Sequence, residues 1–286
     1  MKPFLYSKPR SLEEALEAME EVNARALAGG SDLLVEMREG KIQPKRIVDV
    51  KALPELACFS VSEDGVTIGG RVTLSQLVES KELERTCPLL VDAALTIATP
   101  QVRNRATLVG NLCTASPAAD LAPPLFVLDA TVVVVSRNGE KRFPIQQFFK
   151  GPKKNCLQPG QLVLRVEIPS HSTGRGVFMK KSRVRGHDLA TINVAGWVNP
   201  QDGILRICIG ACGPTPISLV GSDELYRGAA SREKLIDGLV LLAQEQIAPI
   251  DDLRASAMYR RGLVDVFLKR MTRVLLPEEG DLIGAS

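Results

Sequence analysis

The chain of 286 residues has few side chains suited to metal binding or redox chemistry. It contains two histidines, His171 and His187, which is too few for a dedicated metal cage. It has six cysteines, at positions 58, 87, 113, 156, 208 and 212, without a CxxC pair. Because iron–sulfur clusters need grouped thiolates, we expect no metal on this chain and mostly small buried thiols.

Strong net charge and long apolar runs are also missing. The chain carries 36 basic and 33 acidic residues, for a net charge of +3, which gives no electrostatic case for nucleic-acid binding. Its most apolar segment, 121–135, is too short and too interrupted by Pro123, Pro124 and Asp129 to span a bilayer. The N-terminus shows no export signal, so we predict a cytoplasmic protein.

The familiar catalytic and nucleotide-binding motifs are missing as well. There is no GxGxxG and no GxxxxGK[ST], so neither a Rossmann site nor a P-loop is indicated. HExxH and GxSxG are missing too. The sequence therefore gives no catalytic nucleophile and no acid–base pair.

The first part of the chain has the pattern of a β-α-β unit. Ser11 and Glu14 form a capping box ahead of apolar residues at helical spacing, which predicts a helix over 11–21. A short strand then ends in the turn "LAGGSDLL", a second helix is stopped by Gly40, and "RIVDV" at 46–50 is a buried strand.

The remainder divides into two further modules. Strands are predicted at 65–69 and 162–169, a Thr-capped helix from Thr73, a long loop over 107–123, and a hairpin turning at Asn138-Gly139. After a polar linker come three antiparallel strands and two closing helices, 231–246 and 256–276. We predict modules over 1–55, 56–170 and 175–286.

Two stretches rich in small residues are candidate sites. Leu27–Leu34 places two glycines, Ser31 and Asp32 at a strand-to-helix turn, where backbone N–H groups and the helix dipole favour an anion. Ser31 could cap the following helix, whereas Asp32 would oppose a phosphate unless it points away. A plain tight turn is the favoured alternative for this stretch alone.

The second candidate is Thr107–Asp120, "TLVGNLCTASPAAD". Its glycine permits close backbone approach, its Thr, Asn and Ser are neutral donors, and Asp120 is an acceptor for a sugar hydroxyl or a ring N–H. The alternative is a solvated Ω-loop. The apolar segments on either side favour a buried loop, and buried polar groups need partners.

Taken together, "LAGGSDLL", "PQVRNRATLVGNLCTASPAADLAPPLFVLDA", "IGGRVTLSQL", "PGQLVLRVEIP", the Arg183/Arg185/Asp188 run and "GPTPI" resemble the flavin-binding subunit of the molybdenum hydroxylases. This is the xanthine dehydrogenase and carbon monoxide dehydrogenase group. The resemblance follows the same order over nearly the whole chain.

The resemblance implies a set of FAD contacts. The family's first loop holds the FAD pyrophosphate through backbone amides, here Leu27, Ala28, Gly29, Gly30, Ser31, Asp32, Leu33 and Leu34. The family's T-x-G-G-N loop corresponds to Thr107, Val109, Gly110 and Asn111, with Val109 in place of a glycine. Ser116 and Asp120 match family positions that contact the adenosine part of FAD and its neighbouring groups. Val163 and Lys180 match two further family positions that contact the cofactor. Without the resemblance, the favoured alternatives are a valine in the core of a strand for Val163 and a solvated lysine for Lys180. The adjacent Lys181 could also be the lysine that matches the family position.

The resemblance also implies fold and function. The expected fold is α+β, with two FAD-binding subdomains of the vanillyl-alcohol-oxidase (PCMH) type and a C-terminal antiparallel sheet-and-helix domain like that of carbon monoxide dehydrogenase flavoproteins. The expected function is electron transfer from the iron–sulfur clusters of a small subunit through FAD to NAD+ or another acceptor. A large subunit holds molybdopterin, and the complex is commonly a doubled heterotrimer. The alternatives are a stand-alone flavin oxidoreductase and a cofactor-free scaffold or maturation protein.

Overall fold

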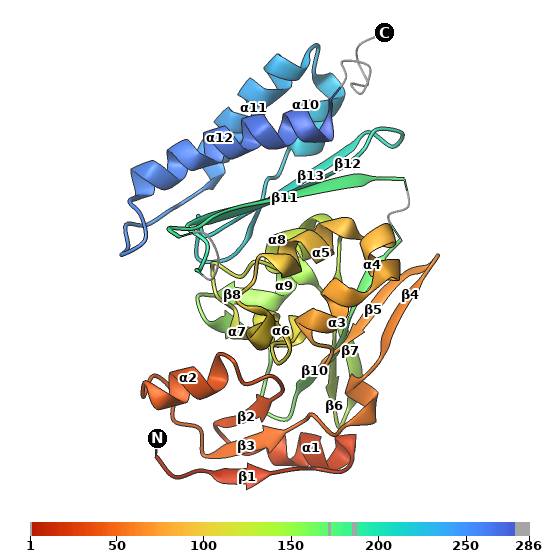
Figure 1. Ribbon diagram of the computed structural model, residues 1–286, viewed down its shortest axis with the longest axis vertical. Coiled ribbons are helices and arrows are strands. Elements are labelled where there is room, and N and C mark those ends of the chain that lie inside the picture. The colour runs from red at the N-terminus through yellow and green to blue at the C-terminus, as the bar shows by residue number, and fades with distance from the viewer. Residues whose placement is uncertain (1, 171–172, 185–187, 278–286) are drawn as a thin grey trace. The chain divides into compact units, whose positions relative to one another are not determined.

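The computed structural model describes residues 2–170, 173–184 and 188–277, drawn in colour in Figure 1. The chain forms two compact units. Unit 1 comprises Met1–Leu83, Ala98–Ala115 and Asp129–Ser170, and unit 2 comprises Glu84–Ile97, Ser116–Leu128 and His171–Ser286. His171, Arg185 and His187 lie outside the described residues, as does part of the predicted linker.

Unit 1 begins with a small parallel sheet in the order β1-β3-β2, formed by Leu5–Ser7, Arg46–Asp49 and Ala24–Leu27. Helix α1 (Leu12–Met19) starts where its cap Ser11 accepts a hydrogen bond from the N–H of Glu14. Helix α2 (Leu33–Arg38) connects β2 to β3. The predicted β-α-β unit is confirmed, and the glycine turn joins β2 to α2.

A five-stranded antiparallel sheet makes up most of the rest of unit 1. Its order is β4-β5-β10-β6-β7, with bounds Phe59–Ser62, Gly65–Gly69, Leu162–Pro169, Thr131–Ser136 and Gly139–Pro144. The predicted hairpin between β6 and β7 is confirmed, although its two turn residues are Arg137 and Asn138, one position before the predicted pair, because Gly139 already pairs with Ser136. The shorter elements are η1 (Pro54–Leu56), α3 (Leu74–Glu79), α6 (Pro100–Arg103), α7 (Leu108–Thr114), α9 (Ile145–Phe148), β8 (Phe149–Gly151) and β9 (Lys154–Asn155).

Helix α7 corrects the prediction of a long loop over 107–123. Thr107 caps this helix, and Leu108, Val109 and Leu112 are buried beneath it. Ala115 then ends the helix in the left-handed conformation, with φ of 46°. The helix has seven residues, about two turns, which is too short for its small and polar residues to show a clear periodicity.

Unit 2 is built on a second antiparallel sheet, in the order β11-β12-β13-β14, with bounds Arg175–Lys181, Ile192–Asn199, Ile204–Gly210 and Ile217–Ser218. Helix α12 (Ala257–Leu275) packs on β11 and β12, and α8 (Ala122–Val127) packs on β12 and β13 (Figure 1). All eight residues of β12 are buried, because helices cover both faces of the strand. The other helices of unit 2 are α5 (Pro88–Leu95), α10 (Ser222–Gly228) and α11 (Arg232–Gln246), and α4 (Lys81–Thr86) contains the boundary between the two units after Leu83. The predicted antiparallel strands and closing helices are confirmed.

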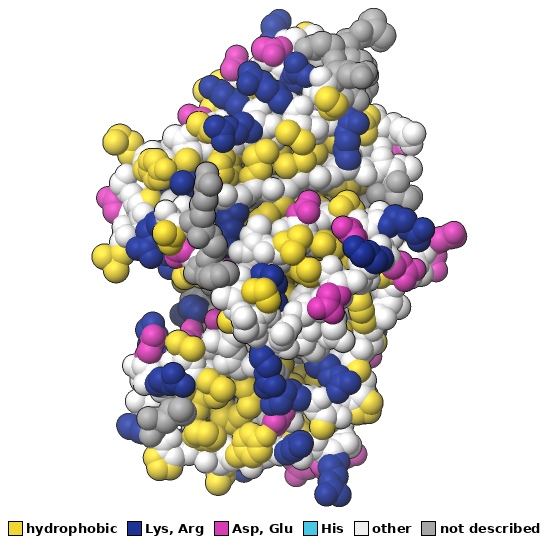
Figure 2. Space-filling model, in the orientation of Figure 1, with side chains coloured by type: hydrophobic (Ala, Val, Ile, Leu, Met, Phe, Trp, Pro, Cys, Tyr) yellow, Lys and Arg dark blue, Asp and Glu magenta, His cyan; other side chains and the backbone are white. Residues whose placement is uncertain are grey.

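The surface carries charges of both signs. Figure 2 shows Lys and Arg side chains interspersed with Asp and Glu over the visible face, without a single broad basic area. None of the helices in the described ranges is both long and apolar enough to serve as a membrane span.

Candidate functional site

The glycine turn of unit 1 leaves a row of backbone donors without acceptors. Strand β2 ends at Leu27 and α2 begins at Leu33, so the turn itself is short. Gly30 has φ of 76°, a left-handed conformation that favours glycine, and its carbonyl accepts a hydrogen bond from the N–H of Leu34. Within the described residues, the N–H groups of residues 29–33 donate to no protein acceptor. Such a row of donors at a helix start suits an anionic group.

The carboxylate of Asp32 points to the second candidate loop. Asp32 occupies the N-cap position of α2 without a side-chain capping bond, so the prediction that Ser31 caps this helix is wrong. The Asp32 carboxylate instead accepts a hydrogen bond of 3.0 Å from the hydroxyl of Thr114 at the end of α7. This contact directs the Asp32 carboxylate towards the end of α7.

Close packing against residues 105 and 106 explains why position 29 is a glycine. A Cβ atom built on Gly29 would overlap the backbone carbonyl of Arg105, so only glycine fits there. The neighbouring segment is fixed in turn, because the N–H of Leu74 donates to the carbonyl of Ala106 at 2.8 Å. The structure therefore brings Leu27–Leu34 and the start of the second loop together within unit 1.

The N-terminus of α7 offers polar groups beside this turn. Thr107 is 4% exposed, and its hydroxyl accepts a hydrogen bond of 2.9 Å from the N–H of Gly110. The buried side-chain oxygen of Asn111 has no hydrogen-bond partner among the described residues. A buried amide oxygen without a donor is costly, so a bound ligand that donates a hydrogen bond would stabilise it.

Val109 fits the structure without backbone strain. It lies inside α7, its φ is not positive, and its side chain is buried. The valine in place of the family glycine therefore packs in the core, and a positive φ is not required there. Val163 is likewise buried, on β10, opposite Val134 of β6.

In unit 2, Asp120 and Lys180 form a buried ion pair. Their side chains are 7% and 8% exposed, and Lys180 Nζ lies 2.7 Å from Asp120 Oδ2. Lys180 also donates to the carbonyl of Thr96 at 3.1 Å. The alternative of a solvated lysine is therefore wrong for Lys180. The neighbouring Lys181 is exposed.

Asn193 completes this cluster and was missed at the sequence level. Its side chain is fully buried on β12 and donates to Asp120 Oδ1 at 2.8 Å and to the carbonyl of Ala119 at 3.3 Å. Burial raises the pKa of Asp120, against the opposing effects of Lys180 and of the Asn193 hydrogen bond. The sequence did contain a signal for this residue, because Asn193 is a polar side chain inside the apolar run "ATINVAGWV". Ser116 lies in the same unit, where its hydroxyl accepts from the N–H of Ala118 at 3.3 Å.

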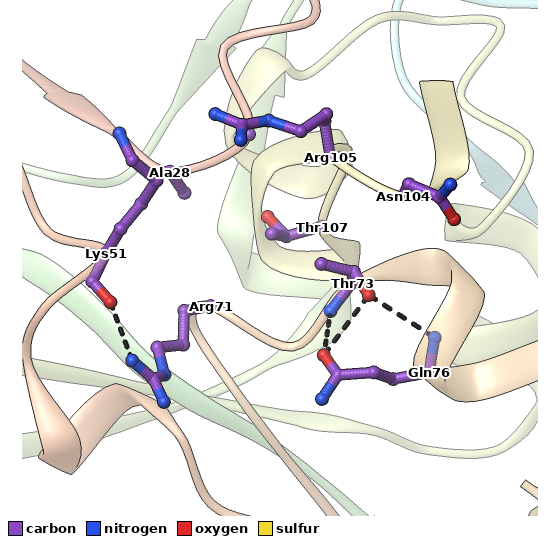
Figure 3. Close-up of a pocket in the computed structure, with 9 residues that line it drawn as sticks. Ala28, Lys51, Arg71, Thr73, Gln76, Asn104, Arg105 and Thr107 are labelled. Carbon is purple, nitrogen blue, oxygen red and sulfur yellow. Dashed lines mark hydrogen bonds between the residues drawn. The ribbon is translucent and has the colours of Figure 1, made fainter. Parts of the chain in front are cut away.

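A basic cavity of about 220 Å³ in unit 1 was also missed (Figure 3). Its residues come from the glycine turn, from the segments after β3 and β5, from helix α3, and from the segment between α6 and α7. Three of them are cationic and none is a carboxylate. They are Ala28, Gly29, Lys51, Arg71, Thr73, Gln76, Asn104, Arg105 and Thr107.

The cysteines are spread through the fold. Cys87, Cys208 and Cys212 are buried, and burial raises the pKa of Cys212 to about 12, so it stays a protonated thiol at neutral pH. Cys58 is exposed, which differs from the expectation of buried thiols. Over the described ranges, His, Cys, Asp and Glu form no group arranged to hold a metal ion.

The row of backbone N–H groups without protein acceptors suits an anionic group. Two family models cover the chain. Residues 2–171 match the FAD binding domain in molybdopterin dehydrogenase, and residues 177–275 match the CO dehydrogenase flavoprotein C-terminal domain. The chain belongs to the family of FAD-binding subunits of the molybdopterin dehydrogenases.

Individual relatives agree with this membership. A putative xanthine dehydrogenase FAD-binding subunit of Escherichia coli K12 is 30% identical over 274 residues, which cover 93% of this chain and 94% of the relative. The carbon monoxide dehydrogenase medium chain of Hydrogenophaga pseudoflava is 28% identical over 272 residues, covering 93% and 95%.

Solved structures share the fold. A carbon monoxide dehydrogenase of Hydrogenophaga pseudoflava that lacks the Mo-pyranopterin moiety superposes with a TM-score of 0.91, at 27% identity, over 96% of this chain and 98% of that one. Quinoline 2-oxidoreductase of Pseudomonas putida 86 gives a TM-score of 0.89, also at 27% identity, over 96% and 98%. The predicted family and the α+β fold class are confirmed.

The residues present fit FAD, which is the cofactor of this family. The first loop supplies free N–H groups for a diphosphate, and Asn111 offers an acceptor with no protein partner. The chain is therefore an FAD-binding oxidoreductase subunit of the molybdenum hydroxylase type.

Proposed function

We propose that this chain is the electron-transfer subunit of a multi-subunit molybdenum hydroxylase. In this proposal, iron–sulfur clusters on a small partner subunit deliver electrons to FAD on this chain, and NAD+ or another acceptor receives them. Flavin suits such a relay because it accepts electrons singly and delivers them in pairs. The observation that carries the proposal is the row of free N–H groups over residues 29–33, in a chain whose family binds FAD.

The roles of this chain's residues are to bind and orient the cofactor. The backbone amides of Leu27–Leu34 hold the diphosphate, and Asp32 is kept away from it by its hydrogen bond to Thr114. Thr107, Val109, Gly110 and Asn111 form the second set of contacts. Ser116, Asp120 and Lys180 of unit 2 and Val163 of unit 1 keep their predicted roles as cofactor contacts. A catalytic acid or base is not required for this function.

The division into modules over 1–55, 56–170 and 175–286 belongs to the same proposal. Each range contains its own sheet: β1-β3-β2, then β4-β5-β10-β6-β7, then β11-β12-β13-β14. Helices α5 and α8, from the middle range, group with the C-terminal sheet. This grouping supports a middle module that contributes to both compact units.

The names of the relatives support partner subunits. Several are called medium chains, among them the glyceraldehyde dehydrogenase medium chain of Sulfolobus acidocaldarius, and a matching structure is described by the Mo-pyranopterin moiety it lacks. We therefore propose a molybdopterin-binding large subunit and an iron–sulfur small subunit as partners, commonly in a doubled heterotrimer, in the cytoplasm.

The test begins with the full chain alone. We expect a yellow protein with bound FAD that does not oxidise candidate purine, aldehyde or heterocyclic substrates. Added cluster-containing and molybdopterin-containing subunits should then reduce the flavin when substrate is present, as followed by flavin absorbance under anaerobic conditions. Turnover by the chain alone would favour a stand-alone flavin oxidoreductase. A colourless chain that takes up no FAD would contradict the proposal and favour a scaffold.

A further inference from the structure

The basic cavity of unit 1 lies directly against the glycine turn. Ala28 and Gly29 of the first loop and Thr107 of the second loop form part of its wall. Figure 3 shows the side chains of Lys51, Arg71 and Arg105 arranged around the same space, each from a different segment of the chain. At about 220 Å³ the cavity is smaller than a typical site for a whole ligand, so it suits one part of a larger molecule.

The charges of this cavity are not all neutralised by protein groups. Lys51 is paired at 2.7 Å with the buried carboxylate of Asp49. Arg71 donates at 2.6 Å to the backbone carbonyl of Lys51, which is a neutral acceptor. The guanidinium of Arg105 has no acceptor within the described ranges. Both arginines are exposed, and neither has a carboxylate partner within the described ranges, so both are available to an incoming anion.

Arginine is well suited to bind phosphate groups. Its planar guanidinium donates two parallel hydrogen bonds to phosphate oxygens, and such charge-assisted bonds are stronger than neutral ones. The other polar side chains of the wall are largely occupied. Thr73 and Gln76 form a capping box with each other, and the side-chain oxygen of Asn104 accepts from Ser75. The arginines are thus the groups most available to a ligand.

We propose that Arg71 and Arg105 form an anion site for the diphosphate of the adenosine diphosphate part of FAD and set the preference of this chain for FAD over smaller flavins. This inference rests on the proposed function, because it assumes that FAD is the ligand of the adjoining turn. The backbone amides of the turn hold phosphate oxygens from one side, and the two arginines supply the opposite charge from the side of the cavity.

The variants that test this site are Arg71→Met and Arg105→Met, which remove charge and keep much of the side-chain volume. Lys51 is left intact, because its removal would leave the buried carboxylate of Asp49 without its ion pair. Arg38→Met is the matched control, since Arg38 is an exposed arginine of α2 that does not line the cavity. Arg71→Lys keeps the charge and separates its effect from that of side-chain shape.

Binding is measured on the full chain stripped of flavin, with FAD, riboflavin, ADP and adenosine as probes. ADP should compete with FAD and adenosine should not. Arg71→Met and Arg105→Met should each raise the dissociation constants of FAD and ADP about tenfold, and leave that of riboflavin unchanged. Arg71→Lys should retain most of the ADP affinity, and Arg38→Met should match the wild type. Added salt should weaken FAD binding more in the wild type than in the methionine variants.

The possible failures are distinguishable. If the wild type binds FAD and neither methionine variant weakens FAD or ADP, the inference is overturned and the proposed function stands. If Arg38→Met weakens FAD and ADP binding as much as Arg71→Met and Arg105→Met do, the loss reflects net charge alone, and the inference is again overturned. If the wild type takes up no FAD, the proposed function fails and the inference that rests on it fails too, even where ADP binds through the arginines. Circular dichroism and thermal unfolding identify any variant that fails to fold, and the methionine variant of the other arginine then carries the test.

Discussion

At the scale of single residues, burial decides what Lys180 and Asp120 do. Both belong to residue types that usually stay in water, and both are almost fully buried here. Taking charges out of water is costly, and the cost is offset by the ion pair and by the hydrogen bonds from Lys180 to Thr96 and from Asn193 to Asp120. The pair therefore fixes the positions of both charged groups inside unit 2.

We expect Lys180→Met to destabilise unit 2 by about 3 kcal/mol, because it leaves the Asp120 carboxylate buried without its partner. The double variant Lys180→Met/Asp120→Asn should recover most of this loss, since no unpaired charge then remains. Urea unfolding followed by fluorescence of Trp197, the single tryptophan and a residue of unit 2, measures both. A double variant as unstable as Lys180→Met would show that shape, and not charge, holds the cluster together.

A substitution at Gly29 tests the glycine turn, and the same substitution at Gly40, which follows α2, is its control. Gly29→Ala should displace the Arg105 carbonyl and abolish FAD binding, because the added Cβ has no space. Gly40 has φ of 73° with no atom close to the Cβ position, so Gly40→Ala should cost only about 1 kcal/mol and keep FAD affinity. FAD titration and urea unfolding check the two variants. Normal FAD binding by Gly29→Ala would show that the turn does not depend on this close packing.

At the scale of secondary structure elements, one ion pair holds the start of α12. Arg260 is 3% exposed, and it contacts the Asp252 carboxylate at 2.7 Å and the carbonyl of Ile250 at 3.1 Å. The Arg260 hydrogen bond is among the contacts that lower the pKa of Asp252 to about 2, against the opposing effect of burial. The segment before α12 is thereby tied to the helix, although Leu253 in that segment is fully exposed to solvent.

The lowered pKa of Asp252 predicts a pH-dependent contribution to stability. Because the folded-state pKa lies below the ordinary value, the contribution is present above about pH 4 and is lost as the pH falls through about 2. Asp252→Asn should therefore lower the free energy of unfolding by about 1 kcal/mol at pH 7, a value reduced for the partial solvent exposure of the carboxylate. The two proteins should converge towards pH 2 in urea unfolding. A difference that stays constant with pH would exclude the ion pair as its cause.

At the scale of the whole molecule, FAD binding should couple to stability. A ligand that binds only the folded chain stabilises it by about 2.7 kcal/mol at a hundredfold excess over its dissociation constant. For a chain of 286 residues this corresponds to a rise in Tm of about 4–5 °C with FAD. Differential scanning calorimetry measures the shift, with riboflavin as a control that should give a smaller one. An equal shift with both flavins would indicate that the phosphates and the adenosine add no binding energy.

Much of the fold could be predicted from local signals. Capping residues, apolar periodicity and the turn signal near Asn138-Gly139 located α1, the β6–β7 hairpin, three strands of unit 2 and its two long closing helices, because each signal lies within a few neighbouring residues. Helix α7 was missed, because two turns of small residues are stabilised by burial and by the Thr107 cap more than by their own periodicity. The candidate loops were found from their small residues and their family order.

The sequence by itself determined the family and located the two candidate loops, because these depend on order and spacing along the chain. Only the tertiary structure decided where side chains of distant segments go. It placed Asp32 on Thr114, Lys180 on Asp120 with Asn193 beside it, and Arg71 and Arg105 around one cavity. The physical reason is that burial and pairing arise between residues far apart in sequence. A lysine in "MKKS" reads as solvated until the segments packed around it exclude water and supply its carboxylate partner.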